Sequence, residues 1–225
     1  MQNSIIRLLK LFLGLFLYAL GIVLTINANL GLSPWDVFHQ GLGRVAGLTM
    51  GQASIIVGLV LVVVNVALGE RIGWGTLGNM VFIGLFLDFL MLNHYVPACH
   101  NWLSGTVMML SGLYVIGIAT YFYLAAELGA GPRDGLMVAL TKKTGKSVRL
   151  IRNSIELSVL VVGYFLGGYV GIGTVVMAVV IGYFVQFNLK LFKFDVNSIQ
   201  HRFIDDDIRY VMGVLGKGTS KQENS

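Results

Sequence analysis

The sequence predicts an all-α integral membrane protein with six transmembrane helices, arranged as two inverted three-helix repeats. A proline-containing interrupted segment is expected after the first helix of each repeat. Three observations predict this fold class: the composition suits lipid rather than water, six apolar runs approach the length of a membrane span, and the two halves of the chain align with each other without a gap.

The composition excludes an ordinary water-soluble domain. Of the 225 residues, 56% are hydrophobic and 12% are charged, and the mean hydropathy is +0.77. Soluble domains carry about 25% charged residues, so the lipid bilayer is the expected surrounding. The net charge of +5 comes from Lys and Arg residues that flank apolar runs. They form no single basic face, so we expect no nucleic-acid partner. No metal-ligand or cofactor motif is recognisable, so we also expect no cofactor.

Six apolar runs have the length of membrane-spanning helices. A helix needs about 20 apolar residues to cross a hydrocarbon core of about 30 Å. The runs cover residues about 5–27, 50–68, 72–92, 103–126, 148–168 and 170–190. Between the first and second runs, and again between the fourth and fifth, lies a moderately apolar stretch that is too short to cross.

An internal repeat relates the two halves of the chain. A shift of 98 residues gives about 22 identities over about 79 positions, and we call residues 98 apart paired positions. Pro34 pairs with Pro132 and Asp36 with Asp134. Apolar composition does not explain matched proline and aspartate, so the alignment predicts a duplicated unit.

The repeat and the charge pattern predict one topology. Residues 1–98 and 99–194 form the two repeats, and residues 195–225 form a cytoplasmic tail. Three crossings return the chain on the opposite side, so the second repeat should be inverted. Lys and Arg gather in alternate connections, which favours cytoplasmic placement of both termini. On this basis Trp35 should lie at the outer interface and its pair Arg133 at the cytoplasmic one.

The interrupted segments each read as the start of a helix. Ser33 suits an N-cap, Pro34 the first helical position and Asp36 the first turn; Gly131, Pro132 and Asp134 repeat the arrangement. Two interpretations remain open. The motifs either start short helices without further function, or mark re-entrant segments whose carboxylates and free backbone groups line a polar path.

Further polar residues inside the predicted spans are candidate solute-binding groups. Asp88 and its pair Gln186 lie in the third spans of the repeats, and Asp88 could relay a proton or cation or sit solvated near the outer end. Arg152 and Glu156 are four residues apart and can pair, leaving Glu156 either a structural partner or a titrating group in a cavity. His39 could meet Asp36, although an interfacial histidine is more often solvated.

The segment Leu30-Gly-Leu-Ser-Pro-Trp-Asp-Val-Phe-His-Gln-Gly-Leu42, with Leu128-Gly-Ala-Gly-Pro-Arg-Asp-Gly-Leu136, resembles the YczE/YitT group of bacterial membrane proteins, particularly its YczE branch. The likeness covers all six predicted spans and not the tail. It implies a location in the bacterial cytoplasmic membrane, and it implies no substrate.

The leading functional hypothesis is a small secondary transporter or channel-like carrier of an unknown solute or ion. Inverted repeats with interrupted segments favour it, and no nucleotide-hydrolysing motif is present. The alternative is a membrane regulator or assembly partner that binds another protein through its cytoplasmic loop and tail. We expect no enzymatic activity, because no nucleophile and base form a recognisable constellation.

Overall fold

The computed structural model describes residues 4–194 and 203–206, and most of the predicted tail lies outside this range. The long elements of the described chain are all helices. In order they are α1 (Ser4–Asn27), α2 (Pro34–Ala46), α3 (Met50–Ala67), α4 (Trp74–Leu92), α5 (Trp102–Leu124), α6 (Pro132–Thr144), α7 (Val148–Phe165) and α8 (Ile172–Leu191). The six long helices agree with the six predicted spans to within a few residues.

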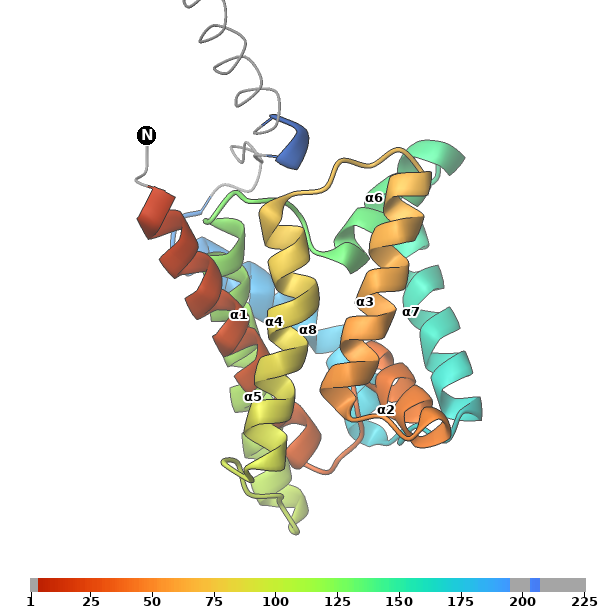
Figure 1. The fold of residues 1–225 in the computed structure, drawn as a ribbon. Helices are drawn as coiled ribbons and strands as arrows, with labels where there is room; N and C mark the ends of the chain where they lie inside the picture. The colour runs from red at the N-terminus through yellow and green to blue at the C-terminus, as the bar shows by residue number, and fades with distance from the viewer. Residues whose placement is uncertain (1–3, 195–202, 207–225) are drawn as a thin grey trace, which may run out of the picture.

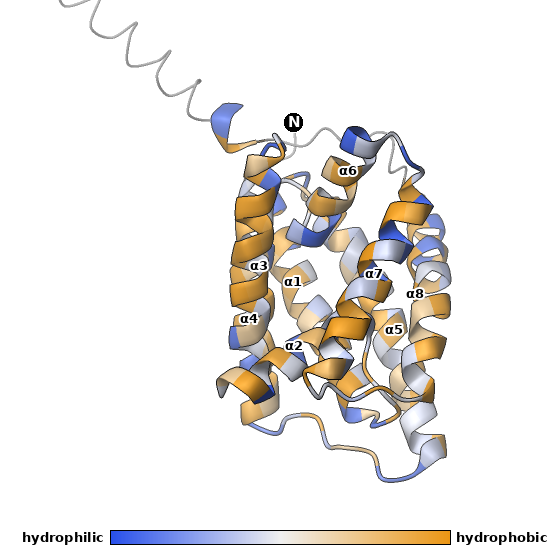
Figure 2. Cartoon of the chain, turned by 90° about the vertical axis from the view of Figure 1, so that its right-hand side faces the viewer, coloured by the Kyte–Doolittle hydropathy of each residue, from blue (hydrophilic) through white to orange (hydrophobic). Residues whose placement is uncertain are grey.

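The two short helices lie at opposite ends of the bundle. In Figure 1, α2 is at the lower end and α6 at the upper end, where the described chain also begins. Figure 2, a quarter turn away, shows the same separation. Each short helix has 13 residues, or about 20 Å of rise, so neither could cross a core of about 30 Å.

The outer surface of the bundle is apolar, as lipid contact requires. Large hydrophobic side chains are exposed along α3, α5 and α8, such as Val63, Val107 and Ile172, and Figure 2 shows hydrophobic residues along most of the helix lengths. Five described helices are long and apolar enough to cross a membrane, namely α1, α3, α4, α5 and α8. Exposed apolar area on this scale marks a lipid-facing surface.

Helix α7 differs from the other long helices in the number of its charged residues. It is as long as α3, with 18 residues, but its first half contains Arg149, Arg152 and Glu156. It is not among the five candidate spans. Charged side chains in a span are tolerated where they face protein or water. Two of these charged residues, Arg152 and Glu156, border a cavity.

Capping residues define both short helices. Ser33 precedes α2 with extended backbone dihedral angles, and its side chain accepts from the Asp36 amide at 3.4 Å. Proline occupies the first turn of both helices, where its missing amide proton costs nothing. Both helices end at a left-handed glycine, Gly47 and Gly145. The cap of α6 is Gly131, which offers no side-chain hydrogen bond.

The loop before each short helix docks on the far half of the chain. The Leu30 carbonyl accepts from the Gly173 amide at 2.7 Å, and the Leu128 carbonyl accepts from the Gly75 amide at 2.6 Å. These carbonyls satisfy free amides at the starts of α8 and α4, which otherwise lack intrahelical partners. The Thr76 hydroxyl donates a further hydrogen bond to the Ala130 carbonyl at 2.6 Å. The two halves are therefore interlocked, and the short helices are held at fixed depths.

Helices α1 and α5 pack closely against each other. A Cβ atom on Gly21 would lie 2.9 Å from the Gly112 carbonyl oxygen, and one on Gly112 would lie 2.8 Å from that of Gly21. Small residues allow this close approach, which is the usual basis of helix packing in membranes. Leu15 of α1 and Leu113 of α5, which are paired positions, are both fully buried.

Candidate ligand cavity between the short helices

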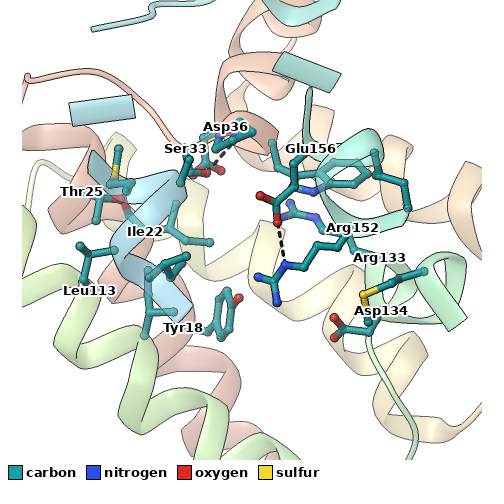
Figure 3. A pocket seen from close by; sticks show the side chains of 18 residues that line it. Tyr18, Ile22, Thr25, Ser33, Asp36, Leu113, Arg133, Asp134, Arg152 and Glu156 are labelled. Carbon is teal, nitrogen blue, oxygen red and sulfur yellow. Dashed lines mark hydrogen bonds and ion pairs between the residues drawn. The ribbon is translucent and has the colours of Figure 1, made fainter. Parts of the chain in front are cut away.

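Two adjoining cavities lie where the N-termini of α2 and α6 face each other. The smaller, of about 120 Å³, is bordered mainly by α1, α2, α5, α6, α7 and α8, and the larger, of about 290 Å³, reaches α3 and α4. The residues common to both linings are Tyr18, Ile22, Arg133, Asp134, Arg152 and Ile181. Figure 3 shows the smaller cavity from close by.

Arg133 lies at the boundary between the cavities and contacts α2. Its guanidinium carbon is 4.7 Å from the centre of the Trp35 ring, a cation–π arrangement. Its Nη2 atom is 3.4 Å from Nε2 of His39. Trp35 and Arg133 are paired positions, so equivalent residues of the two halves touch each other at the centre of the protein.

Asp36 is buried and held by side chains of its own helix. The Ser33 hydroxyl donates to one carboxylate oxygen at 2.5 Å, and Nδ1 of His39 lies 3.8 Å from the other. Asp36 and His39 are 4% and 1% exposed. The carboxylate also lies in the first turn of α2, where the helix dipole favours negative charge. Asp36 therefore already has hydrogen-bonding and polar partners within its own helix.

Asp134 has the equivalent position in α6 and very different surroundings. The residues paired with Ser33 and His39 are Gly131 and Met137, which cannot bond a carboxylate. Among the described residues, Asp134 makes no hydrogen bond and no ion pair, although Arg133 and Arg152 are close enough to influence its charge. Asp134 lies inside the protein, but its side chain is accessible because it borders the two cavities.

Arg152 and Glu156 form the ion pair that their spacing predicts. The Arg152 Nε atom donates to a Glu156 oxygen at 3.0 Å, as the dashed line in Figure 3 marks. Both side chains border the smaller cavity. The same view places Asp36 with Ser33 on one side of this pair and Asp134 on the other. The structure thus brings Asp36, Asp134 and Glu156 to one site.

The other candidate residues lie in different settings. Pro34 borders the smaller cavity and Pro132 the larger. Asp88 is not among the lining residues, because its carboxylate accepts from the Thr49 hydroxyl and from the Gly51 amide at 2.8 Å, at the N-terminus of α3. Gln186 is exposed and borders neither cavity. In the described chain, no group of three or more His, Cys, Asp or Glu residues is placed to hold a metal ion.

Two expectations about individual residues are wrong. Trp35 and Arg133 do not lie at opposite interfaces, because each belongs to a short helix whose N-terminus returns towards the centre, where the two residues meet. His39 is buried rather than solvated, since it lies between Asp36 and Arg133. A signal in the sequence could have indicated the first contact. In the inverted arrangement that the sequence predicts, residues near the axis that relates the two halves would contact their own paired positions.

Comparison with known proteins identifies the family of this chain. A family model described as "Family of unknown function (DUF6198)" matches residues 5–190, which include α2, α6 and every cavity-lining residue. The chain belongs to this family. The match ends close to the last residue of α8. The site described here therefore lies within the part of the chain that defines DUF6198.

Individual relatives of this DUF6198 chain extend the finding. It is 41% identical over 192 residues to the uncharacterized membrane protein YczE of Bacillus subtilis, covering 84% of this chain and 87% of that protein. It is 36% identical over 184 residues to an uncharacterized protein of Haemophilus influenzae, covering 80% and 84%. The resemblance to the YczE branch is confirmed, and the chain is a YczE-like multi-pass membrane protein. No solved structure matches it.

Proposed function

We propose that the protein is a small secondary carrier that moves a polar solute through the central cavities. In this proposal the membrane is crossed six times, with α7 as the sixth span, and residues 1–98 and 99–194 form inverted halves. The observation that carries the proposal is the placement of charged residues from both short helices around a shared cavity. Interrupted helices that meet at the interface of inverted repeats are the usual setting of a transporter binding site.

The charge on α7 supports its role as a span that borders an aqueous path. Its Arg152 and Glu156 side chains border the smaller cavity and pair with each other. An ion pair beside water costs far less than isolated charges in lipid. The helix can therefore cross the bilayer in spite of its composition.

A difference between the two halves supports movement. Helices α3 and α4 are closely packed, and a Cβ atom on Gly84 would lie 2.6 Å from the Gly51 carbonyl oxygen. The equivalent pair, α7 and α8, is not among the closely packed helix pairs of the described chain. At Gly182, the pair of Gly84, no atom lies within 4 Å of the Cβ position.

This difference suggests the conformational change that a carrier needs. If the halves are equivalent by origin, each can adopt the arrangement of the other. In the second state, α7 and α8 would close along the Gly182 face while α3 and α4 separate. Such an exchange opens a central site first to one side of the membrane and then to the other, which is the rocking motion expected of inverted-repeat carriers.

The orientation follows from charge. Lys142, Lys143 and Lys146 lie around the end of α6, at the end of the bundle where the described chain begins. Residue Arg71 lies on the α3–α4 connection and donates to Asp205 of the short described segment at 2.7 Å. Basic connections favour the cytoplasmic side. We therefore assign this end, with both termini, to the cytoplasm of a bacterial cell.

The test is solute uptake by purified protein in liposomes. Vesicles are incubated with a defined mixture of amino acids, amines, carboxylic acids and sugars, and their contents are measured by mass spectrometry. We expect protein-dependent uptake of at least one component, reduced at least tenfold by Arg133→Ala, because Arg133 borders both cavities and joins the short helices. Empty liposomes give the background.

Uptake equal to that of empty liposomes, by protein that remains folded, would contradict the proposal. A chain that ends at residue 195 separates the carrier from the alternative function, a regulator that acts through its tail. A carrier retains uptake without the tail, because the cavity lining lies entirely in residues 18–185. A regulator would show no uptake in either form.

A further inference from the structure

We infer that the solute is a small organic cation with N–H donors, such as a primary ammonium, and that Asp134 is its counter-charge. This rests on the proposed carrier function and names the class of substrate. It follows from the pairing of charges around the cavities, the hydrogen-bonding state of the lining hydroxyls and the difference between Gly131 and Ser33.

Asp134 is the one lining charge without a partner among the described residues. The cavities are bordered by three carboxylates and two guanidinium groups, which leaves one excess negative charge when His39 is neutral. Glu156 pairs with Arg152, Asp36 is bonded to Ser33, and Arg133 lies against Trp35 and His39. An unpaired carboxylate within a bilayer is costly, so a bound cation would stabilise the protein.

An anionic solute fits the same site poorly. Both guanidinium groups are already engaged, Arg152 at 3.0 Å from Glu156 and Arg133 over the Trp35 ring. An anion would have to share a guanidinium group with the partner that it already has, and it would also approach Asp134. A cation can bind Asp134 without disturbing either arginine.

Two of the hydroxyl groups that line the larger cavity present acceptors to a ligand. The Tyr123 hydroxyl donates to the Gly129 carbonyl at 2.9 Å, and the Thr120 hydroxyl donates to the Ile116 carbonyl at 2.8 Å. Each hydroxyl has one hydrogen and two lone pairs. With their hydrogens engaged by backbone, these oxygens are free to accept, which suits a ligand whose charged nitrogen carries hydrogens.

The larger cavity has room for the body of such a solute. Its volume of about 290 Å³ extends from Asp134 to an apolar wall. A proton alone would need no such space. The apolar wall consists of Val57, Leu61, Met80, Ile83, Ile181 and Val185. An alkyl ammonium places its charge at Asp134 and its chain against this wall.

Gly131 explains why Asp134 is free and supplies a selective test. Ser33 bonds Asp36 in α2, whereas Gly131 stands at the paired position in α6. A Cβ atom on Gly131 would lie 3.3 Å from Oδ2 of Asp134 and 3.5 Å from the Tyr123 hydroxyl. The backbone dihedral angles of Gly131, φ −62° and ψ 158°, also suit serine. Gly131→Ser should therefore provide Asp134 with an internal partner and compete with the ligand.

The experiment measures the melting temperature of purified full-length protein against concentrations of three probes at constant ionic strength. The probes are butylammonium, which has N–H donors, tetramethylammonium, which has the same charge and no donors, and butyrate. Binding to the folded state raises the melting temperature with concentration. We expect butylammonium to do so, and the other two probes to have no saturable effect.

Variants identify the site. Asp134→Asn and Gly131→Ser should each raise the half-maximal concentration of butylammonium at least tenfold. Glu70→Gln should not change it, since Glu70 pairs with Lys142 and borders neither cavity. We also expect Gly131→Ser without ligand to melt no lower than the unmodified protein, because serine is a better N-cap than glycine. Loss of binding in that variant therefore cannot reflect misfolding.

The inference is overturned if tetramethylammonium or butyrate stabilises the protein as strongly as butylammonium, or if the Asp134→Asn and Gly131→Ser variants respond like the unmodified protein. These outcomes are distinct from failure of the carrier function. Uptake of a solute other than an amine in liposomes would retain the carrier and reject the cation. Binding of butylammonium without any uptake would retain the site and reject the carrier.

Discussion

Gly84→Ala should destabilise the protein, whereas the same substitution at its paired position, Gly182→Ala, should stabilise it. A Cβ atom on Gly84 would lie 2.5 Å from the side chain of Ile55 and 2.6 Å from the Gly51 carbonyl oxygen. Forcing an extra carbon into a packed contact costs about 1–3 kcal/mol. No atom lies within 4 Å of the equivalent Cβ position at Gly182, so there alanine adds helix propensity of up to about 1 kcal/mol.

Thermal or denaturant unfolding of the two variants in the same detergent tests this pair of outcomes. Both substitutions change a glycine to alanine inside a long helix, so the propensity gain is common to both and the difference reports on packing. Equal effects at the two positions would mean that α3–α4 and α7–α8 are packed alike. The carrier function adds a second consequence: Gly182→Ala should slow uptake although it stabilises the protein, because the added methyl group obstructs closure of α7 on α8.

The paired aspartates should also differ. We expect Asp36→Asn to lower the free energy of unfolding by roughly 1–2 kcal/mol, because it weakens a charge-assisted hydrogen bond from Ser33 and removes negative charge from the first turn of α2. Asp134→Asn should leave stability unchanged or raise it, since Asp134 has no hydrogen bond or ion pair among the described residues and its charge is costly there.

Chemical denaturation of the two variants beside the unmodified protein provides the measurement. The substitutions are identical and occupy the same position in two short helices, so each is the control for the other. A large loss of stability on Asp134→Asn would indicate an internal partner for that carboxylate. It would also remove the reason to place a cationic ligand there.

Much of the fold could be predicted from local sequence patterns. The apolar run at residues 50–68 predicts a helix that the structure has at Met50–Ala67 (α3). The run at residues 148–168 predicts the helix at Val148–Phe165 (α7). The cap, proline and aspartate of each interrupted segment predicted the first turns of α2 and α6. These features depend on residues close together in the chain, where hydropathy and capping preferences apply directly.

The site was predicted only in part, because its remaining contacts join distant segments. The basic residues that follow Arg133 in the sequence predict a position at the cytoplasmic interface. Its contact with Trp35 joins two distant segments and is seen only in the structure. The sequence predicts for Asp88 either a relay of protons or cations or a solvated position near the outer end of its span. Its carboxylate instead binds the N-terminus of α3, which the pattern of its own helix cannot reveal. The contrast between Asp36 and Asp134 was visible in the paired residues Ser33 and Gly131, once their role as partners was known.

A carrier of this design requires the two halves to exchange conformation, and one cross-linking measurement tests this exchange directly. Ile55 touches the Gly84 face of α4, so their paired positions, Asn153 and Gly182, should meet when α7 closes on α8. Both are changed to cysteine with Cys99→Ser, since Cys99 is the only native cysteine, and the protein is oxidised in liposomes. We predict that a disulfide forms between positions 153 and 182 and stops uptake. Reduction of this disulfide should restore uptake. Full retention of both free thiols in folded protein, or uptake unaffected by complete cross-linking, would contradict the account.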